Sequence, residues 1–199
     1  MSKDWIGNTK STYTTLGASN HSDHNRAEHD YYATEPSTIN ELIAQNLSLS
    51  KNIWECAAGE RHLSKRLIEF GFNVKETDII SRCPKVEVLD FLSIPNNYLF
   101  NGDIITNPPY KYALEFVQKA LSIIPEQRLV CMFLKLTFLE GQKRYHFFKQ
   151  YPPKYVYVYS SRRKCAYNGM FDSSSSATCY AWFVWEKGST TEPIIRWVL

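Results

Sequence analysis

Residues 52–79 read NIWECAAGERHLSKRLIEFGFNVKETDI, and this stretch decides the fold. It begins with a short apolar run that predicts a buried strand over residues 52–57. Apolar side chains then recur at helical spacing over residues 62–70, and Gly71 closes this helix. Residues 73–79, NVKETDI, are expected to form another strand. A strand, a helix and a strand in this order indicate a crossover unit, which joins parallel strands of one sheet.

The rest of the chain continues this alternation of strands and helices. A first helix begins at Ser37, and two more are expected over residues 112–124 and 140–150. Five further strands are expected at residues 86–92, 103–106, 128–136, 155–160 and 177–187. The loop before the last strand has no helical period, so that strand need not run parallel to the others. The sequence therefore predicts an α/β fold, with a mostly parallel seven-stranded sheet, an antiparallel last strand and helices on both faces.

The length of the chain fits one domain, because 199 residues can bury one proper core. Residues 1–30 are polar and have no sustained period, so we expect an N-terminal arm or lid before a single domain over residues 31–199. The histidines and acids of this arm match no metal-binding spacing, and no metal is expected. A formal net charge of +3 permits an anionic partner but does not by itself indicate one.

Cysteine usage and hydropathy indicate where the protein works. Its five cysteines are scattered, and an odd number without a paired spacing does not suit a disulfide framework. The chain begins without an apolar segment of signal-peptide length, and no later window reaches the length of a membrane span. We therefore expect a cytoplasmic protein that does not contact a membrane.

Small and polar residues stand where the predicted strands end. In an open parallel sheet, ligands bind beyond the carboxyl ends of the strands. The first strand ends in a turn of small residues around Gly59, which lets a ligand approach the backbone. The second ends at Asp78, at the spacing from which an acid can reach ribose hydroxyls, and the third ends at Asp90 and Phe91. Together these ends indicate a nucleoside-type cofactor, with its adenine at the third strand, its ribose at the second and its remainder at the first.

The fourth strand ends in the sequence ITNPPY, residues 105–110. Pro108 and Pro109 make a rigid turn, because proline has no backbone N–H and its φ is fixed at about −65°. The side-chain oxygen of Asn107 and the carbonyl of Pro108 could then accept from one exocyclic amino group, with the Tyr110 ring flat against the attached base. Two acceptors would localise the nitrogen lone pair and aim it at an electrophilic methyl group. The alternative is a proline-rich loop with no chemical role.

These motifs resemble those of the Rossmann-like, class I S-adenosylmethionine-dependent methyltransferases, and among them the DNA adenine N6-methyltransferases. NPPY resembles their catalytic motif, and WECAAGE (residues 54–60) resembles their cofactor loop. DYYATEP (residues 30–36) resembles a segment that packs around the methionine end of the cofactor. The resemblance is closest to small bacteriophage or prophage enzymes, which implies the cytoplasm of a bacterial host. It implies S-adenosylmethionine as cofactor and methyl transfer to the N6 amino group of adenine in DNA, with the base flipped out of the duplex.

The resemblance also assigns site residues. Those implied in cofactor binding are Tyr32, Ala33, Thr34, Pro36, Glu55, Ala57, Gly59, Asp78, Ile79, Asp90, Phe91 and Asn107. Those implied in catalysis are Asn107, Pro108, Pro109 and Tyr110. Two positions depart from the family pattern, because Cys56 stands where proline is usual and Arg61 stands where a second glycine is usual. Arg61 makes the cofactor loop less permissive, which affects how the methionine end is held.

Target specificity needs a source within or outside the chain. After Leu136 the sequence only completes the sheet, which leaves no room for the separate target-recognition domain that is usual in sequence-specific enzymes of this motif order. Specificity is therefore expected to be low, to come from short loops, or to be supplied by a partner, with a homodimer as one possibility.

The identity of the methylated amino group is open to more than one interpretation. The NPPY motif also resembles those of RNA adenine methyltransferases and of enzymes that methylate a glutamine amide on release factors. Arg162, Arg163 and Lys164 suit phosphates, and Phe171 falls where related enzymes carry an aromatic residue that stacks on the flipped base. Lys135, near a strand end, faces either the site or solvent. The plainer interpretations are a solvated turn and a core phenylalanine.

Further phosphate candidates stand in the last predicted helix, at Lys143, Arg144 and Lys149. The basic segment and Phe171 favour a nucleic-acid base over a protein amide, and adenine in DNA is the substrate that we expect. The alternatives are adenine in RNA, a glutamine amide in a protein, and an accessory protein that binds the cofactor without turnover.

Overall fold

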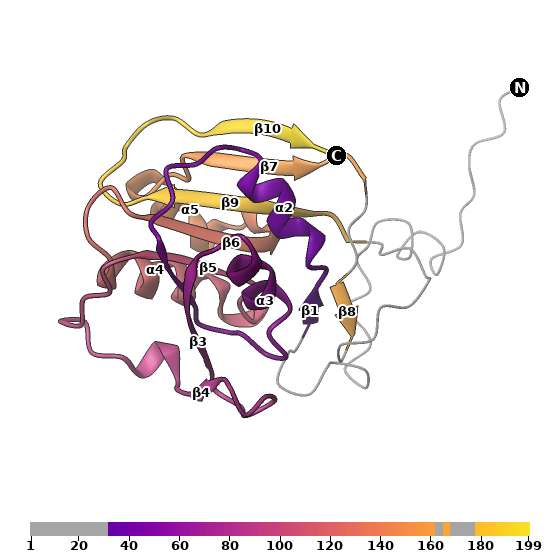
Figure 1. Ribbon diagram of the computed structural model, residues 1–199. Coiled ribbons are helices and arrows are strands. Elements are labelled where there is room, and N and C mark those ends of the chain that lie inside the picture. Colours follow the sequence, from indigo (N-terminus) through magenta and orange to yellow (C-terminus); the bar gives the residue numbers. More distant parts are fainter. Residues whose placement is uncertain (1–31, 162–164, 168–177) are drawn as a thin grey trace, which may run out of the picture.

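The computed structural model describes residues 32–161, 165–167 and 178–199 (Figure 1). It contains the crossover unit on which the fold prediction depends. Strand β2 (Asn52–Glu55) and strand β3 (Asn73–Asp78) are paired in parallel, and helix α3 (His62–Glu69) joins them. Leu63 and Leu67 of α3 are buried at helical spacing, so the apolar face of the helix packs on the sheet.

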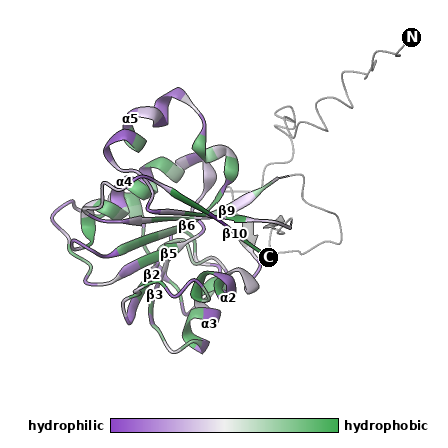
Figure 2. Cartoon of the chain, turned by 90° about the horizontal axis from the view of Figure 1, so that it is seen from above, coloured by the Kyte–Doolittle hydropathy of each residue, from purple (hydrophilic) through white to green (hydrophobic). Residues whose placement is uncertain are grey.

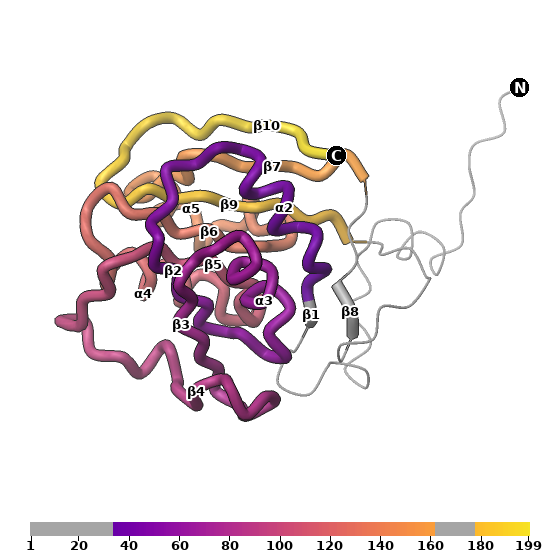
Figure 3. Tube along the Cα trace, viewed as in Figure 1, coloured from indigo at the N-terminus to yellow at the C-terminus, as the bar shows by residue number. Residues whose placement is uncertain are grey.

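Within the described residues, the main sheet has eight strands in the order β10-β7-β9-β6-β5-β2-β3-β4. The strands not yet given are β4 (Glu87–Val88), β5 (Asp103–Thr106), β6 (Leu129–Lys135), β7 (Tyr155–Tyr159), β9 (Tyr180–Glu186) and β10 (Ile194–Val198). Adjoining strands are parallel except around β9, which is antiparallel to both β6 and β7. The chain trace shows β4 and β10 at opposite edges of the sheet (Figure 3).

The predicted α/β fold is confirmed, but the described sheet has eight strands where seven were predicted, and the place of the antiparallel strand differs from the prediction. The antiparallel strand is β9, as the pattern of residues 177–187 suggested, yet it lies inside the sheet. It is also not the last strand, because β10 follows it and pairs in parallel with β7 at the edge. Most of β10 is exposed, so its place depends on pairing with a distant segment and no local pattern marks it.

Helices cover both faces of the sheet. The remaining helices are α2 (Ser37–Ile43), α4 (Ala113–Ile123) and α5 (Gln142–Gln150), with short 3-10 helices η2 (Phe91–Ser93), η3 (Tyr110–Tyr112) and η4 (Leu136–Leu139). Figure 2 shows α4 and α5 on one face and α2 and α3 on the other. The first face buries Trp54 and Phe183, and the second buries Phe133 and Trp182. Each such side chain contributes about 1.5–3 kcal/mol when it is fully buried.

A separate pair of strands lies beside α3. Strand β1 (Tyr32–Thr34) pairs antiparallel with β8 (Cys165–Tyr167), with Ala33 opposite Ala166 (Figure 1). Strand β1 contacts α3, the helix that follows the predicted cofactor loop. The segment predicted to hold the methionine end of the cofactor is therefore joined to the chain between β7 and β9. No helix in the described part of the chain is long and apolar enough to cross a bilayer.

Candidate active site

The predicted site residues follow strands that end at one edge of the sheet. Strands β2, β3, β5 and β6 are parallel, so their carboxyl ends share this edge. They end at Glu55, Asp78, Thr106 and Lys135. The crevice beyond such an edge is where ligands of open parallel sheets bind.

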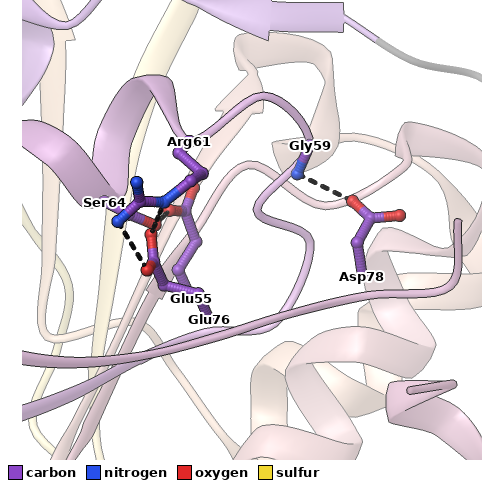
Figure 4. Close-up of polar contacts among 6 residues, drawn as sticks. All are labelled: Glu55, Gly59, Arg61, Ser64, Glu76 and Asp78. Carbon is purple, nitrogen blue, oxygen red and sulfur yellow. Dashed lines mark hydrogen bonds and ion pairs between the residues drawn. The ribbon is translucent and has the colours of Figure 1, made fainter. Parts of the chain in front are cut away.

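The turn after β2 is held by the end of β3. The backbone N–H of Gly59 donates to Oδ2 of Asp78 over 2.8 Å (Figure 4). The N–H of Ala58 donates to the carbonyl of Thr77 over 3.0 Å. Gly59 has a φ of 52°, a left-handed conformation that glycine adopts at low cost. The other oxygen of Asp78 accepts from the N–H of Ile80 over 3.0 Å, so a buried carboxylate organises the turn.

Arg61 takes up the backbone conformation of the glycine that it replaces. Its φ is 70° and its ψ is 28°, which is the left-handed region and costs most side chains about 1–2 kcal/mol. Its guanidinium donates to both oxygens of Glu76, over 2.7 and 2.8 Å. The hydrogen bond with Glu76 raises the pKa of Arg61. Arg61 therefore adopts a left-handed conformation in the turn and joins the loop to β3 by an ion pair.

Glu55, the last residue of β2, is a buried carboxyl group. It accepts a hydrogen bond from the hydroxyl of Ser64 on α3 (Figure 4). Burial raises the pKa of Glu55, the bond from Ser64 lowers it, and the nearby Glu76 and Asp78 raise it, so that the pKa is about 8. The carboxyl group is therefore mostly protonated at neutral pH. We call Glu55, Glu76 and Asp78 together the carboxylate cluster.

The predicted adenine end of the site is divided between exposed and buried residues. Asp90 is exposed, and its side chain accepts from the N–H of Leu92 over 2.9 Å, which caps η2. Phe91 is only 2% exposed, and its ring packs edge-on against Trp54 with the centroids 5.4 Å apart. Ile79 is 60% exposed directly after Asp78. Ile79 and Asp90 are therefore open to a ligand, whereas the Phe91 ring belongs to the core.

The segment from β1 to α2 contributes hydroxyl groups. Thr34 is 2% exposed, and its Oγ1 has no hydrogen-bond partner among the described residues. The same holds for Oγ of Ser37, at the start of α2 after Pro36. The carbonyl of Thr38 accepts from Nε1 of Trp182 over 3.0 Å, which fixes this segment to the sheet. Two buried donors are thus available to a ligand that offers acceptors.

Two of the three residues of β1 can be described only by their backbone. The side chains of Tyr32 and Ala33 lie outside the described residues, as do Arg162, Arg163, Lys164 and Phe171. The N-terminal arm also falls outside them. Ala57, in the cofactor loop, is half-buried against the core of the α4 face.

The NPPY motif follows a strand that is buried along its whole length. Pro108 is buried, and Asn107 and Tyr110 are half-buried at the end of β5. The carbonyl of Pro109 accepts from the N–H of Tyr112 over 2.9 Å, so η3 begins at the motif and leads into α4. The rigid turn predicted from the two prolines is therefore fixed between a core strand and a core helix.

Two residues from other strands contact the motif tyrosine. The Nζ of Lys135 lies 5.0 Å from the ring centroid of Tyr110, and the Tyr180 ring lies 5.9 Å from it. Lys135 and Tyr180 are directly opposite each other on β6 and β9. Lys135 was expected to face either the site or solvent, and in the structure it lies beside the motif. We call Asn107, Tyr110, Lys135 and Tyr180 the NPPY cluster.

Arg144 has a structural role and is a poor phosphate candidate. Its Nε donates to the carbonyl of Phe138 over 2.8 Å, and Nη2 donates to the carbonyls of Thr137 and Glu140. Its guanidinium also lies 5.0 Å from the Phe138 ring centroid. These contacts hold the η4 loop closed. Lys143 and Lys149 are exposed on α5.

Sequence reasoning missed the Arg61–Glu76 pair and the place of Tyr180. Tyr180 belongs to an aromatic run that reads as sheet packing, and it does stack on Phe133 with the rings 5.2 Å apart. Its contact with Tyr110 depends on the register of β9 against β6, which no local pattern reveals. The signal for Arg61 was the missing glycine itself, since a side chain there must adopt the left-handed conformation.

The comparisons with known proteins give a fold. No model of a known protein family matches the chain, and no curated protein matches it. Among solved structures, a candidate RNA methyltransferase from Pyrococcus horikoshii superposes with a TM-score of 0.57 at 14% identity, over 92% of this chain and 99% of its own. A candidate class I S-adenosylmethionine-dependent methyltransferase from Listeria monocytogenes has a TM-score of 0.55 at 11% identity, over 95% of this chain and 70% of its own.

A third similar structure is the modification subunit of a candidate type I restriction enzyme from Vibrio vulnificus. Its TM-score is 0.60 at 10% identity, over 96% of this chain and 52% of its own, so the present chain spans about half of that subunit. At such identities the likeness concerns the fold. The chain has the Rossmann-like fold of the class I methyltransferases, with β10 as an additional strand at the edge of its sheet.

Proposed function

We propose that the protein transfers a methyl group from S-adenosylmethionine to the N6 amino group of adenine in DNA. The observation that carries this proposal is the position of NPPY at the end of β5, on the same sheet edge as the carboxylate cluster. One set of residues suits a cationic nucleoside cofactor, and the other suits an amino group on an aromatic ring. The fold supports the same reaction class.

The residues near the cofactor loop fit S-adenosylmethionine. Asp78 would accept from the ribose hydroxyls, and Ile79, which is 60% exposed, would offer an apolar surface to the adenine. The buried hydroxyls of Thr34 and Ser37 are donors for the cofactor carboxylate. A cationic ligand beside the carboxylate cluster would favour the ionised form of Glu55 over its neutral form. When bound, the cofactor would supply an electrophilic methyl group on a sulfonium ion.

The residues of the NPPY motif would orient the acceptor nitrogen. Oδ1 of Asn107 and the carbonyl of Pro108 accept from the two hydrogens of the amino group, which directs its lone pair out of the ring plane. Tyr110 stacks on the base, and Phe171 is proposed to stack on its other face. The nitrogen would gain the methyl carbon as the carbon–sulfur bond breaks, leaving S-adenosylhomocysteine, and would lose one proton to water. No base with a shifted pKa is required.

The nearest alternative is adenine in RNA, which would use the same motif. It is favoured by one comparison, because the Pyrococcus protein described as a candidate RNA methyltransferase matches over nearly its whole length. The Vibrio subunit, which belongs to a restriction enzyme, supports DNA and a partner subunit. We propose one catalytic domain over residues 31–199 with an N-terminal arm, and a specificity partner or second copy as the source of target choice.

The test is transfer of labelled methyl groups from S-adenosylmethionine to separate pools of DNA, total RNA and release factor. The proposal expects label in DNA, recovered after digestion as N6-methyladenosine in its deoxy form. Label in RNA alone would move the substrate to the alternative. Label in the release factor, or in none of the pools at saturating cofactor, would contradict the proposed function.

A further inference from the structure

Lys135 carries a positive charge beside the catalytic motif that no described residue neutralises. It is the last residue of β6, and its side chain is half-buried. Its Nζ lies over the ring of Tyr110, 5.0 Å from the centroid. Among residues 32–161, 165–167 and 178–199, no carboxylate lies within ion-pair distance of this ammonium, and none of its N–H groups donates a hydrogen bond.

The arginines at the same sheet edge differ from Lys135 in this respect. Arg61 is paired with Glu76, and Arg82 lies 3.5 Å from Asp78. Arg144 donates to the carbonyls of the η4 loop. Their charges and donors are used within the protein. Lys135 keeps all three donors for a ligand, next to the ring on which the substrate is proposed to stack.

The energies of the two contacts decide what Lys135 binds. A cation over an accessible aromatic ring gains little free energy. A hydrogen bond between an ammonium and a charged acceptor contributes more. An anion within reach would therefore take the ammonium as its partner, and the ring contact holds the side chain in place until one arrives.

We propose that Lys135 binds a backbone phosphate of the nucleic acid, next to the nucleotide whose base stacks on Tyr110. This inference rests on the proposed function and adds a recognition element for the phosphodiester backbone. A nucleotide carries its phosphates one sugar away from its base, so a cation beside the base-stacking ring is close to them. Such a contact fixes the position of the strand without reading its sequence.

The same charge discriminates against the amide substrate. A glutamine side chain carries no charge beside its amide, so a cation at this position would gain nothing from it. A half-buried ammonium that no substrate uses would also cost desolvation without return. Lys135 therefore favours DNA or RNA over a release factor, on grounds independent of the NPPY motif.

The test compares Lys135→Met, Lys135→Arg and the parent protein in binding and turnover. The binding probe is a short fluorescein-labelled duplex, with the matching single-stranded RNA as a second arm, in the presence of S-adenosylhomocysteine. The Met variant should bind the probe about tenfold more weakly at low salt. For this variant, the slope of log K against log salt concentration should be smaller in magnitude by about 0.9 for duplex DNA, or by about 0.7 for a single strand. This difference corresponds to the loss of one phosphate contact. The Arg variant keeps the charge and should keep the slope.

A matched control is Lys51→Met, because Lys51 is an exposed lysine that immediately precedes β2, at the opposite edge of the sheet. It should leave affinity and slope unchanged. Cofactor affinity, measured by calorimetry, should stay within about twofold in all variants. The proposal is overturned if Lys135→Met keeps the parent slope, or if only kcat falls while nucleic-acid affinity is kept.

The binding arm keeps this proposal separate from the proposed function. If the parent protein binds the probes and methylates neither, the proposed reaction fails while the salt slopes still test Lys135. If the parent binds neither nucleic acid, the phosphate site is overturned, even where methyl transfer to a protein is found.

Discussion

The ends of β2 and β3 differ in charge and in internal bonding from the ends of β5 and β6. In the carboxylate cluster each acid has a partner, since Glu55 accepts from Ser64, Glu76 is paired with Arg61 and Asp78 accepts from the backbone. In the NPPY cluster, Tyr110 contacts the ring of Tyr180 and the cation of Lys135, and Lys135 has no anionic partner among the described residues.

This difference matches what the two halves are proposed to bind. The cofactor carries positive charge at its sulfonium and amino groups, and the acidic half is assembled before it arrives. A nucleic acid carries negative charge, and the other half offers one uncompensated cation beside an aromatic surface. Pre-assembled partners lower the cost of ordering a site. We therefore expect substitutions in the first half to change cofactor affinity and stability, and those in the second to change turnover and substrate affinity.

The largest expected effect is that of Asn107→Ala. The substitution removes one of the two acceptors that orient the amino group, so turnover should fall about 100- to 1,000-fold. Cofactor affinity should stay within a few-fold, because Asn107 lies in the NPPY cluster. Initial rates with saturating cofactor and DNA, together with calorimetry, measure both. Asp78→Asn is the control from the other half, and it should weaken cofactor binding instead. A variant Asn107→Ala that retained the parent rate would remove the proposed mechanism.

The second prediction concerns pH and Glu55. The folded-state pKa is raised from 4.5 to about 8, so the unfolded chain loses this proton at a lower pH than the folded protein does. The contribution of Glu55 to stability is therefore fully present below about 4.5 and is lost as pH rises through about 8. Glu55→Gln keeps the neutral form and should be relatively more stable at pH 8.5, by on the order of a few kcal/mol.

Urea unfolding of the parent and Glu55→Gln proteins at several pH values measures this difference. The gap between the two should widen with pH from about 5 to about 8. A gap that stays constant over this range would mean that the folded and unfolded proteins bind the proton equally. Binding of a cationic cofactor should favour the ionised carboxylate, so the gap should narrow at saturating S-adenosylmethionine.

The third prediction separates the backbone and the side chain of Arg61. Arg61→Ala and Arg61→Gly both remove the ion pair with Glu76, but only glycine adopts a φ of 70° at low cost. The glycine variant should therefore be more stable than the alanine variant by about 1 kcal/mol. Thermal or urea unfolding resolves such a difference. Equal stability would show that the loop relaxes out of the left-handed conformation once the guanidinium is gone.

Arg61 also shows what could and could not be predicted from the sequence. The alternation of apolar strands and helices identified β2, α3, β3 and α4, because their periods are local. The site residues at the ends of these strands follow from the same pattern. A glycine position occupied by arginine marks an unusual backbone, but its partner on β3 depends on the packing of the loop against that strand.

What the sequence did not reveal depends on pairing between distant segments. Strand β10 is short and mostly exposed, and it is held by its register with β7. The contact of Lys135 with Tyr110 can be predicted only when the relative positions of β5 and β6 are known. The contact of Tyr180 with Tyr110 can be predicted only when the register of β9 against β6 is known. The Phe91 ring, which the resemblance assigns to the adenine pair, packs edge-on against Trp54, a contact that depends on the distant strand β2.

The smallest expected effect is that of Thr34→Val, which tests whether the hydroxyl of this β1 residue binds the cofactor. Valine has nearly the same shape, and Oγ1 has no partner among the described residues, so Thr34→Val should leave stability equal or slightly higher. If the hydroxyl donates to the cofactor carboxylate, the dissociation constant of S-adenosylmethionine should rise about five- to tenfold, which is about 1–1.4 kcal/mol. Thr38→Val is the matched control, since that hydroxyl donates to the carbonyl of Glu35 over 2.8 Å and its loss should lower stability alone. Unchanged cofactor affinity together with lower stability in Thr34→Val would place this hydroxyl in the scaffold and would remove β1 from the cofactor half.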